Sequence, residues 1–326
     1  MRVIAGDNVN TVWPQALELM DMEATENDSR NGKVRVHPMP VTSVYYKPTE
    51  RVIFDPVRDA NPFFHLHEAL WMLAGRDDAI WLDRFIKDFS SRFAEEGGVM
   101  HGAYGKRWRG WFQHRNHKID QLDVCVDLLK KNPLDRQAVI QMWDPETDLG
   151  VPDLKDRPCN QQVLLRADRG VLDMTVTCRS NDAVYGCYGA NVVHFSVLQE
   201  YLAARIGIPV GVYYQVSNNF HIYDWAKKNI SYESAMSWFG QEYPGTQPLV
   251  DDPESFDGEV KHYLEYPLGG DVHDFKNSFF AMTAQPMMRA ALDRVYGTDK
   301  ALVSANQIAS PDWRRACIEW LERRRK

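Results

Sequence analysis

A β-hairpin in the middle of the sequence is the feature that most limits how this 326-residue chain can fold. Apolar and polar residues alternate from Leu172 to Cys178, as in a strand with one buried face. The run Val163 to Arg166 precedes this strand across the turn residues Asp168-Arg169-Gly170, so the two runs predict an antiparallel pair. The surrounding helices and strands do not follow a strict β-α-β alternation. The sequence therefore predicts an α+β domain built around a substantial sheet.

Other segments of the sequence support this class. Further strands are predicted at Ala138 to Trp143 and at Val210 to Val216. Helix signals define three runs: Phe63 to Ala74 after the cap Asn61-Pro62 and before Gly75, Val192 to Ile206 closed by Gly207, and Pro311 to Arg325 with a basic end. We interpret residues 1–326 as a single domain, and the Pro-, Gly- and Asp-rich stretch at 243–257 as a surface insertion within it.

Charge and cysteine content exclude several classes of function. The net charge of -7 argues against broad binding of nucleic acid or anionic membranes, although a few local arginines can still hold a small anion. No stretch approaches the ~20 apolar residues that span a bilayer, and the N-terminus lacks the pattern of a signal peptide. Five widely spaced cysteines without a CxxC pair favour the reducing cytoplasm over a disulfide framework.

Cys159 is the first candidate for chemistry. It lies in Arg157-Pro158-Cys159-Asn160, at the end of a polar loop and directly before a strand, where a nearby arginine would favour the nucleophilic thiolate. A small core residue is the alternative for a lone cysteine. Arg179-Ser180 follows the hairpin and suits a phosphate clamp, and a surface ion pair between Arg179 and Asp182 is the alternative there.

Six short motifs, in order, resemble those of thymidylate synthases. His67 to Gly75 is similar to that family's helix with the catalytic glutamate, here Glu68, and Tyr104 to Arg109 is similar to its YGxxWR segment. The other four are the arginine segment Asp135-Arg136, the nucleophile motif Pro158-Cys159, the phosphate motif Arg179-Ser180-x-Asp182 and the ribose motif His221-Ile222-Tyr223. With Arg30, the matches extend over somewhat more than half of the chain.

The resemblance implies a catalytic mechanism. The Cys159 thiolate would add to C6 of a pyrimidine nucleotide, so that C5 attacks the one-carbon unit of the co-substrate 5,10-methylenetetrahydrofolate. Glu68 would organise the proton transfers, and Tyr104 would assist removal of the C5 proton. Asp182 would hold the pterin. From the residues alone, Glu68 could instead be a solvated helix residue, Tyr104 an ordinary half-buried tyrosine and Asp182 a local turn or cap residue.

The resemblance also implies a binding site and an assembly. Arg30, Arg179 and Ser180 would surround the nucleotide phosphate, while His221 and Tyr223 would hold the sugar 3′-hydroxyl. Arg136 would reach the phosphate of a second subunit, which requires a homodimer, and in this fold one face of the large mixed sheet forms the dimer interface. No metal is implied.

Three positions depart from the family pattern. Asn160 follows the nucleophile where the family usually has histidine, and Gln137 replaces a second arginine. The segment Tyr185 to Asn191 replaces the family's LGLPFN, whose asparagine recognises the uracil edge. Alignment without a gap puts Ala190 at that position and Asn191 one place later, so the base reader is either displaced by one residue or replaced. Phage deoxycytidylate hydroxymethylases and related enzymes also differ here.

The C-terminus indicates which product forms. The family closes its site with a short apolar tail, whereas this chain ends in the basic residues Arg323 to Lys326. We expect a less sealed site, in which water traps the exocyclic methylene and gives a 5-hydroxymethyl product. The prediction is therefore folate-dependent hydroxymethylation of a pyrimidine nucleoside monophosphate, with dCMP favoured. Methylation of dUMP and hydroxymethylation of dUMP or CMP are the alternatives. Ser180 favours a deoxynucleotide, and such an enzyme would suit a phage or a bacterium.

Other classes of protein have weaker support. His65 and His67 are two residues apart on a helix and there is no HExxH pattern, which disfavours a metal hydrolase. An inactive nucleotide-binding protein would not need Cys159, Glu68, Tyr104 and Asp182 together. The acidic net charge also disfavours a nucleic-acid-binding module.

Overall fold

The computed structural model describes residues 1–227, 229–269 and 275–325. Within these ranges, eight strands form one mixed sheet with the order β1-β4-β10-β9-β8-β7, and β2 and β3 extend it beside β10. The strands are β1 (Arg2–Gly6), β2 (Thr25–Ser29), β3 (Gly32–Val36), β4 (Val41–Tyr45), β7 (Val139–Gln141), β8 (Asn160–Arg166), β9 (Leu172–Asp182) and β10 (Val210–Tyr223). A separate ribbon pairs β5 (Gln113–His114) with β6 (His117–Lys118). This sheet and the helices around it confirm the predicted α+β class.

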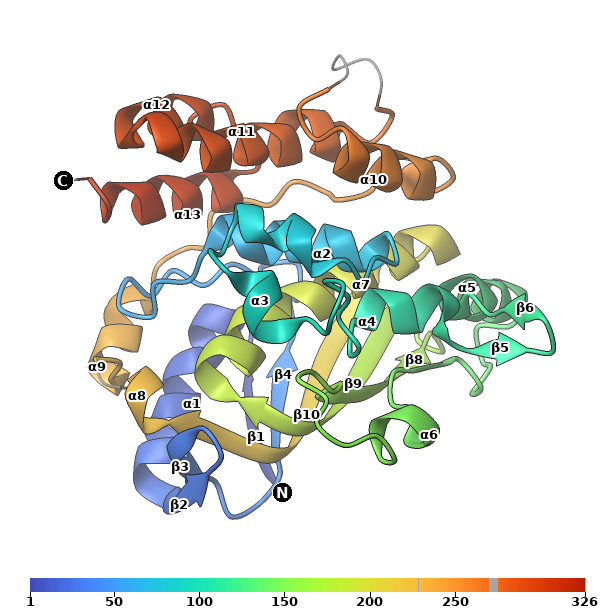
Figure 1. Ribbon diagram of the computed structural model, residues 1–326, viewed down its shortest axis with the longest axis horizontal. Helices are drawn as coiled ribbons and strands as arrows, with labels where there is room; N and C mark the ends of the chain where they lie inside the picture. Colours follow the sequence, from blue (N-terminus) through green and yellow to red (C-terminus); the bar gives the residue numbers. More distant parts are fainter. Residues whose placement is uncertain (228, 270–274, 326) are drawn as a thin grey trace.

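Helices cover the sheet in layers (Figure 1). The long ones are α1 (Val9–Glu23), α2 (Pro62–Leu73), α5 (Gln121–Lys131), α7 (Val192–Ile206), α10 (Phe256–Glu265), α11 (Gln285–Asp293), α12 (Thr298–Ala305) and α13 (Pro311–Glu322). Shorter α-helical turns are α3 (Phe89–Phe93), α4 (Tyr104–Lys106), α6 (Pro145–Asp148), α8 (Asp224–Lys227) and α9 (Tyr232–Ala235). Helix α7 lies next to the sheet, α2 packs on α7, and α10 to α13 form a further layer beyond α2.

Tight 3₁₀ and π turns connect these elements. The 3₁₀ turns are η1 (Ala79–Arg84), η4 (Met236–Trp238) and η7 (Arg294–Tyr296), and the π turns are η2 (Arg107–Trp111), η3 (Ala183–Asn191) and η6 (Phe280–Ala284). No helix among the described residues is long and apolar enough to cross a membrane.

The predicted elements are present, with two informative differences in length. The hairpin of β8 and β9 is confirmed, and α7 has the predicted limits because Gly207 adopts the left-handed conformation (φ 89°) that ends the helix. Helix α13 ends at Glu322, before the predicted Arg325. Strands β9 and β10 both continue past their predicted ends, because they pair in parallel and satisfy each other's backbone groups as far as Asp182 and His221.

One face of the sheet is packed and the other is open. Paired residues of adjacent strands share a face, and Val163, Val176 and Gln215 are buried toward the helices. On the opposite face Leu164, Thr175 and Tyr214 line an open groove with Arg166 and Arg169. The stretch 243–257 has no regular structure before Phe256, buries Leu249 and leads into α10. That it is an insertion within one domain stays a prediction.

Candidate active site

Cys159 lies immediately before β8, with its thiol next to an arginine from β9. The Arg179 Nη2 is 3.9 Å from the Cys159 Sγ, and the Arg179 Nε donates to the Pro158 carbonyl at 2.9 Å. Arg157, the sequence neighbour, instead donates to the carbonyls of Asp148 and Val151. The expectation of a lowered thiol pKa was wrong in its net direction, because burial raises the pKa of Cys159 and Arg179 only partly opposes that effect.

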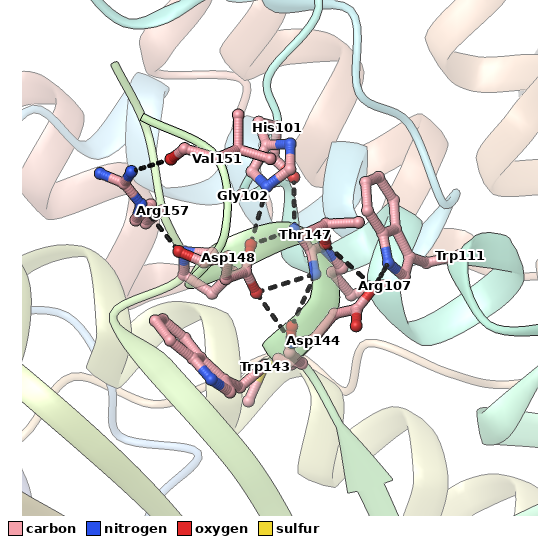
Figure 2. A network of polar contacts seen from close by, with 12 residues as sticks. His101, Gly102, Arg107, Trp111, Trp143, Asp144, Thr147, Asp148, Val151 and Arg157 are labelled. Carbon is pink, nitrogen blue, oxygen red and sulfur yellow. Dashed lines mark hydrogen bonds and ion pairs between the residues drawn. The ribbon is translucent and has the colours of Figure 1, made fainter. Parts of the chain in front are cut away.

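A buried ionic network braces the loop that carries Cys159 (Figure 2). Arg107 is fully buried and donates to both carboxylate oxygens of Asp148 at 3.1 and 2.9 Å, and to the carbonyls of His101 and Met142. The His101 ring also bonds Asp148 at 2.7 Å, and the Gly102 amide donates to Asp156 at 3.0 Å. Because the loop is tied to α4 and η2 at several points, Cys159 and Tyr104 are held in a fixed relation.

The hydroxyl of Tyr104 contacts the nucleophile segment directly. It accepts hydrogen bonds from the backbone N–H groups of Cys159 and Asn160, both at 3.2 Å, and from the Asn160 Nδ2 at 3.0 Å. Burial raises the pKa of Tyr104 well above its ordinary value, so this phenol stays protonated. The predicted pair of Tyr104 and Cys159 is therefore brought together.

Side-chain amides form a buried row behind the thiol. The Asn160 Nδ2 donates to the Asn191 Oδ1 at 3.2 Å, and the Asn191 Nδ2 donates to the Asn181 Oδ1 at 3.0 Å. Gln215 donates to the Asn160 Oδ1 and Asn181 donates to Ser217, so the row is supported from β10. Each amide is at most 7% exposed, and hydrogen bonding to one another offsets the cost of burying them.

The π turn η3 decides between Ala190 and Asn191. A π turn accommodates one more residue per turn than an α-helix. With this extra residue, Asn191 enters the amide row and Ala190 is left half-buried outside it. The structure thus brings Asn191, and not Ala190, to the residues around Cys159; that Asn191 reads the base stays a prediction.

Polar residues predicted for the phosphate and sugar line one groove. It has a volume of about 540 Å³ and lies between the β2–β3 hairpin and the ends of β9 and β10. Its lining includes Arg179, Ser180, His221 and Tyr223. Arg30 is exposed in the turn of the hairpin, close enough to Cys159 to favour its thiolate. The groove thus offers cationic and hydroxyl donors suited to an anionic ligand.

Asp182 and Arg136 do not form part of the amide row: Asp182 caps a turn and Arg136 is exposed. Asp182 accepts from the backbone N–H groups of Val184 and Tyr185, at 3.4 and 2.7 Å, so it is the cap of η3 that the sequence left open as an alternative. Burial raises the pKa of Asp182, and His221 and Arg58 oppose this. Arg136 is exposed in the turn before β7 and forms no ion pair with the described residues. Among the described residues, Arg136 makes no hydrogen bond or ion pair with the other predicted site residues.

Two buried residues near the predicted site, His194 and Arg58, were not predicted from the sequence. Glu68 is 7% exposed in α2, and its Oε2 lies 2.8 Å from the Nε2 of His194 in α7. Arg58 is buried beside η3, where its Nε donates to the Val184 carbonyl at 2.6 Å. The one available signal was a polar residue within an apolar run, as at His194 between Val193 and Phe195.

Comparisons with known proteins found one matching family model and several relatives. The family model described as thymidylate synthase matches residues 56–237. A deoxyuridylate hydroxymethyltransferase of Pseudomonas phage M6 is 43% identical, covering 100% of this chain and 95% of the relative. One of Bacillus phage SP01 is 32% identical over 82% of this chain and 71% of the relative. A thymidylate synthase of Corynebacterium aurimucosum is 29% identical over 50% of this chain and 60% of the relative.

Proposed function

This chain belongs to the thymidylate synthase family and is a one-carbon transferase, and from that premise we propose that it converts dUMP to 5-hydroxymethyl-dUMP with 5,10-methylenetetrahydrofolate as the carbon donor. The observation that carries the proposal is the buried amide of Asn191. Its Oδ1 accepts one hydrogen bond from Asn160, and its Nδ2 donates one to Asn181. The Oδ1 therefore keeps one free lone pair, which suits the N3–H donor of uracil, and the Nδ2 keeps one free N–H, which suits the O4 acceptor.

The relatives support the proposed product. Two phage deoxyuridylate hydroxymethyltransferases align with most of this chain, and the M6 protein aligns beyond residue 237, where the family match ends and α10 to α13 follow. Cytosine, favoured by the sequence, stays the second candidate, because a rotated amide at Asn191 would present its donor to N3 and its acceptor to the 4-amino group.

The site residues account for the chemical steps. The Cys159 thiolate adds to C6 of uracil, and the electron pair placed on C5 forms the bond to the one-carbon unit. The co-substrate supplies this unit at the oxidation level of formaldehyde. Tyr104 assists loss of the C5 proton. The bond between the one-carbon unit and the folate nitrogen breaks, the nitrogen takes the electron pair and a proton, and tetrahydrofolate leaves an exocyclic methylene on C5. Water then adds to the exocyclic methylene and gives its proton to Glu68, and the C6–S bond breaks to restore C5=C6 and the thiolate.

The residues near the groove fit a planar aromatic co-substrate. Tyr185 and Trp225 are half exposed and stack with ring centroids 5.7 Å apart, and Tyr223 stacks on Trp225 at 5.5 Å. These rings would hold the pterin or the benzoyl ring, with Asp182 nearby at the start of η3. They would also limit, though not abolish, access of water to the reacting carbon.

We further propose a cytoplasmic homodimer. The open sheet face at Leu164 and Tyr214 is where a second copy would pack, and the exposed Arg136 would then enter the partner's groove. All five cysteines are free thiols, which suits a reducing compartment.

Mass spectrometry of the products tests the function. The enzyme is incubated with methylenetetrahydrofolate and, separately, with dUMP, dCMP, UMP and CMP, while dihydrofolate is followed by absorbance. We expect hydroxymethylated dUMP without dihydrofolate. Methylated dUMP with one dihydrofolate per turnover would mean a methylating enzyme, and a preference for dCMP would assign Asn191 to cytosine.

A further inference from the structure

His194 contacts the carboxylate of Glu68 across the interface of two helices. The distance from its Nε2 to the Glu68 Oε2 is 2.8 Å, and the residues are 3% and 7% exposed. Low exposure makes this contact strong, because little water competes for either group. The other carboxylate oxygen, Oε1, makes no hydrogen bond to the described residues.

The second nitrogen of His194 indicates that this side chain is more than a packing residue. Its Nδ1 is buried and has no hydrogen-bond partner among the described residues. A buried unpaired polar atom costs about 1–3 kcal/mol, whereas the flanking residues Val193 and Phe195 are apolar and incur no such cost. Position 194 therefore carries a polar ring at a cost to stability, and its one direct polar contact is the proposed catalytic carboxylate.

The neighbouring histidine does not compete for Glu68. His65 lies about one turn before Glu68 in α2, and burial, Arg58 and His194 together lower the pKa of His65 well below its ordinary value. His65 is therefore neutral at neutral pH. Of His65, Arg58 and His194, only His194 is hydrogen-bonded to Glu68.

We propose that His194 is a positioning residue for hydroxymethyl transfer. It donates Nε2–H to the Glu68 Oε2, which fixes the carboxylate so that Oε1 faces the pyrimidine and takes the proton of the water that adds to the exocyclic methylene. This inference rests on the proposed function and adds a residue that acts through Glu68. The extra constraint suits an enzyme that must aim a water molecule as well as a nucleotide.

The test compares His194→Ala with His194→Gln. Glutamine can place an N–H where the Nε2 of histidine lies, but it cannot ionise. For His194→Ala we expect kcat to fall about 100-fold while KM for dUMP changes less than about threefold, because the lost contact aims a proton acceptor and does not bind nucleotide. His194→Gln should recover at least about tenfold of the lost kcat.

Ser196→Ala is the matched control, since Ser196 is also buried in α7 but bonds only the Val193 carbonyl. Its kcat should stay near that of the unmodified enzyme, and urea unfolding of all three variants separates folding from catalysis. The proposal is overturned if His194→Ala keeps its kcat, if glutamine fails to restore it, or if the loss appears in KM alone. An unmodified enzyme that forms no C5-substituted nucleotide would instead refute the proposed function.

Discussion

At the scale of single residues, the site sets burial against charge. The Cys159 thiol is enclosed, which raises its pKa, while the Arg179 guanidinium 3.9 Å away acts in the opposite direction. At neutral pH the unliganded thiol is therefore mostly protonated, and its nucleophilic fraction increases as pH rises toward the pKa. The reactivity of this cysteine thus depends on pH and on the guanidinium.

We predict that alkylation of Cys159 by iodoacetamide accelerates about tenfold per pH unit between about pH 7 and 9, the range below its raised pKa. Arg179→Gln should slow alkylation at pH 8 severalfold, because the pKa of Cys159 rises further without the guanidinium. Arg157→Gln is the control, since that guanidinium binds loop carbonyls. Mass spectrometry of the labelled peptide gives the rates. Equal rates for the two variants would contradict the assignment of Arg179.

Asn191 provides the second prediction at this scale. Asn191→Asp replaces the amide donor with a carboxylate oxygen, which accepts from the cytosine amino group and repels uracil O4. The ratio of kcat/KM for dUMP to that for dCMP should fall about 100-fold, as expected when an unpaired buried group costs ~1–3 kcal/mol on each side. Ala190→Ser should leave the ratio unchanged. A shift in the Ala190 variant alone would place the base reader at position 190.

At the scale of elements, close contact between α2 and α4 relates the predicted acid–base residues. Glu68 lies in α2, Tyr104 begins α4, and the two helices touch at Gly105. A Cβ at Gly105 would lie 2.1 Å from the Met72 carbonyl oxygen and 2.6 Å from its Cα, and backbone atoms cannot yield as a flexible side chain can. The absence of a side chain at position 105 thus allows the two helices to pack.

Gly105→Ala should therefore lower the free energy of unfolding by about 2–3 kcal/mol, the cost of forced overpacking. It should also reduce kcat, because α4 moves away from α2. Gly258→Ala in α10 is the matched control, as nothing lies within 4 Å of its added methyl. It should leave stability unchanged or raise it by up to about 1 kcal/mol. Urea unfolding checks both, and equal stabilities would show that α2 and α4 tolerate separation.

Elements also show how far the sequence could be read. Helix α7 was predictable to the residue, because Gly207 ends it by a local conformational rule. The ends of β9 and β10 were not, since polar residues such as Ser180 and Asn219 extend the strands only by pairing with each other. The offset of Asn191 and its contact with Asn160 depend on a π turn, and the pairing of His194 with Glu68 joins two helices far apart in sequence. A local sequence pattern reveals neither the offset of Asn191 nor the pairing of His194 with Glu68.

At the scale of the whole molecule, the open sheet face and Arg136 suggest that one copy is an incomplete enzyme. The groove already contains Arg179 and Ser180, while Arg136 is exposed at the β7 edge of the sheet. In a symmetric dimer, each site would combine Cys159 of one protomer with Arg136 of the other. Activity would then depend on assembly, and defects in different protomers would complement.

We predict that Cys159→Ser and Arg136→Ala, each of low activity, regain activity when unfolded together in urea and refolded. Random pairing gives one intact site in each mixed dimer, so about a quarter of full activity should return. Mixing Cys159→Ser with Glu68→Gln is the control and should restore none, because both residues belong to the same protomer's site. Light scattering confirms the dimer, and a dimer without recovery would rule out Arg136 as the crossing residue.

The π turn η3 has a consequence for how such enzymes change their substrate over time. Nine residues, Ala183–Asn191, form this π turn between the end of β9 and the start of α7, with more residues per turn than an α-helix has. Loss or gain of a single codon in this stretch would therefore exchange the side chain presented to the base without replacing any amino acid. If Asn191 reads the base as proposed, a single insertion or deletion here would change which nucleotide the enzyme accepts.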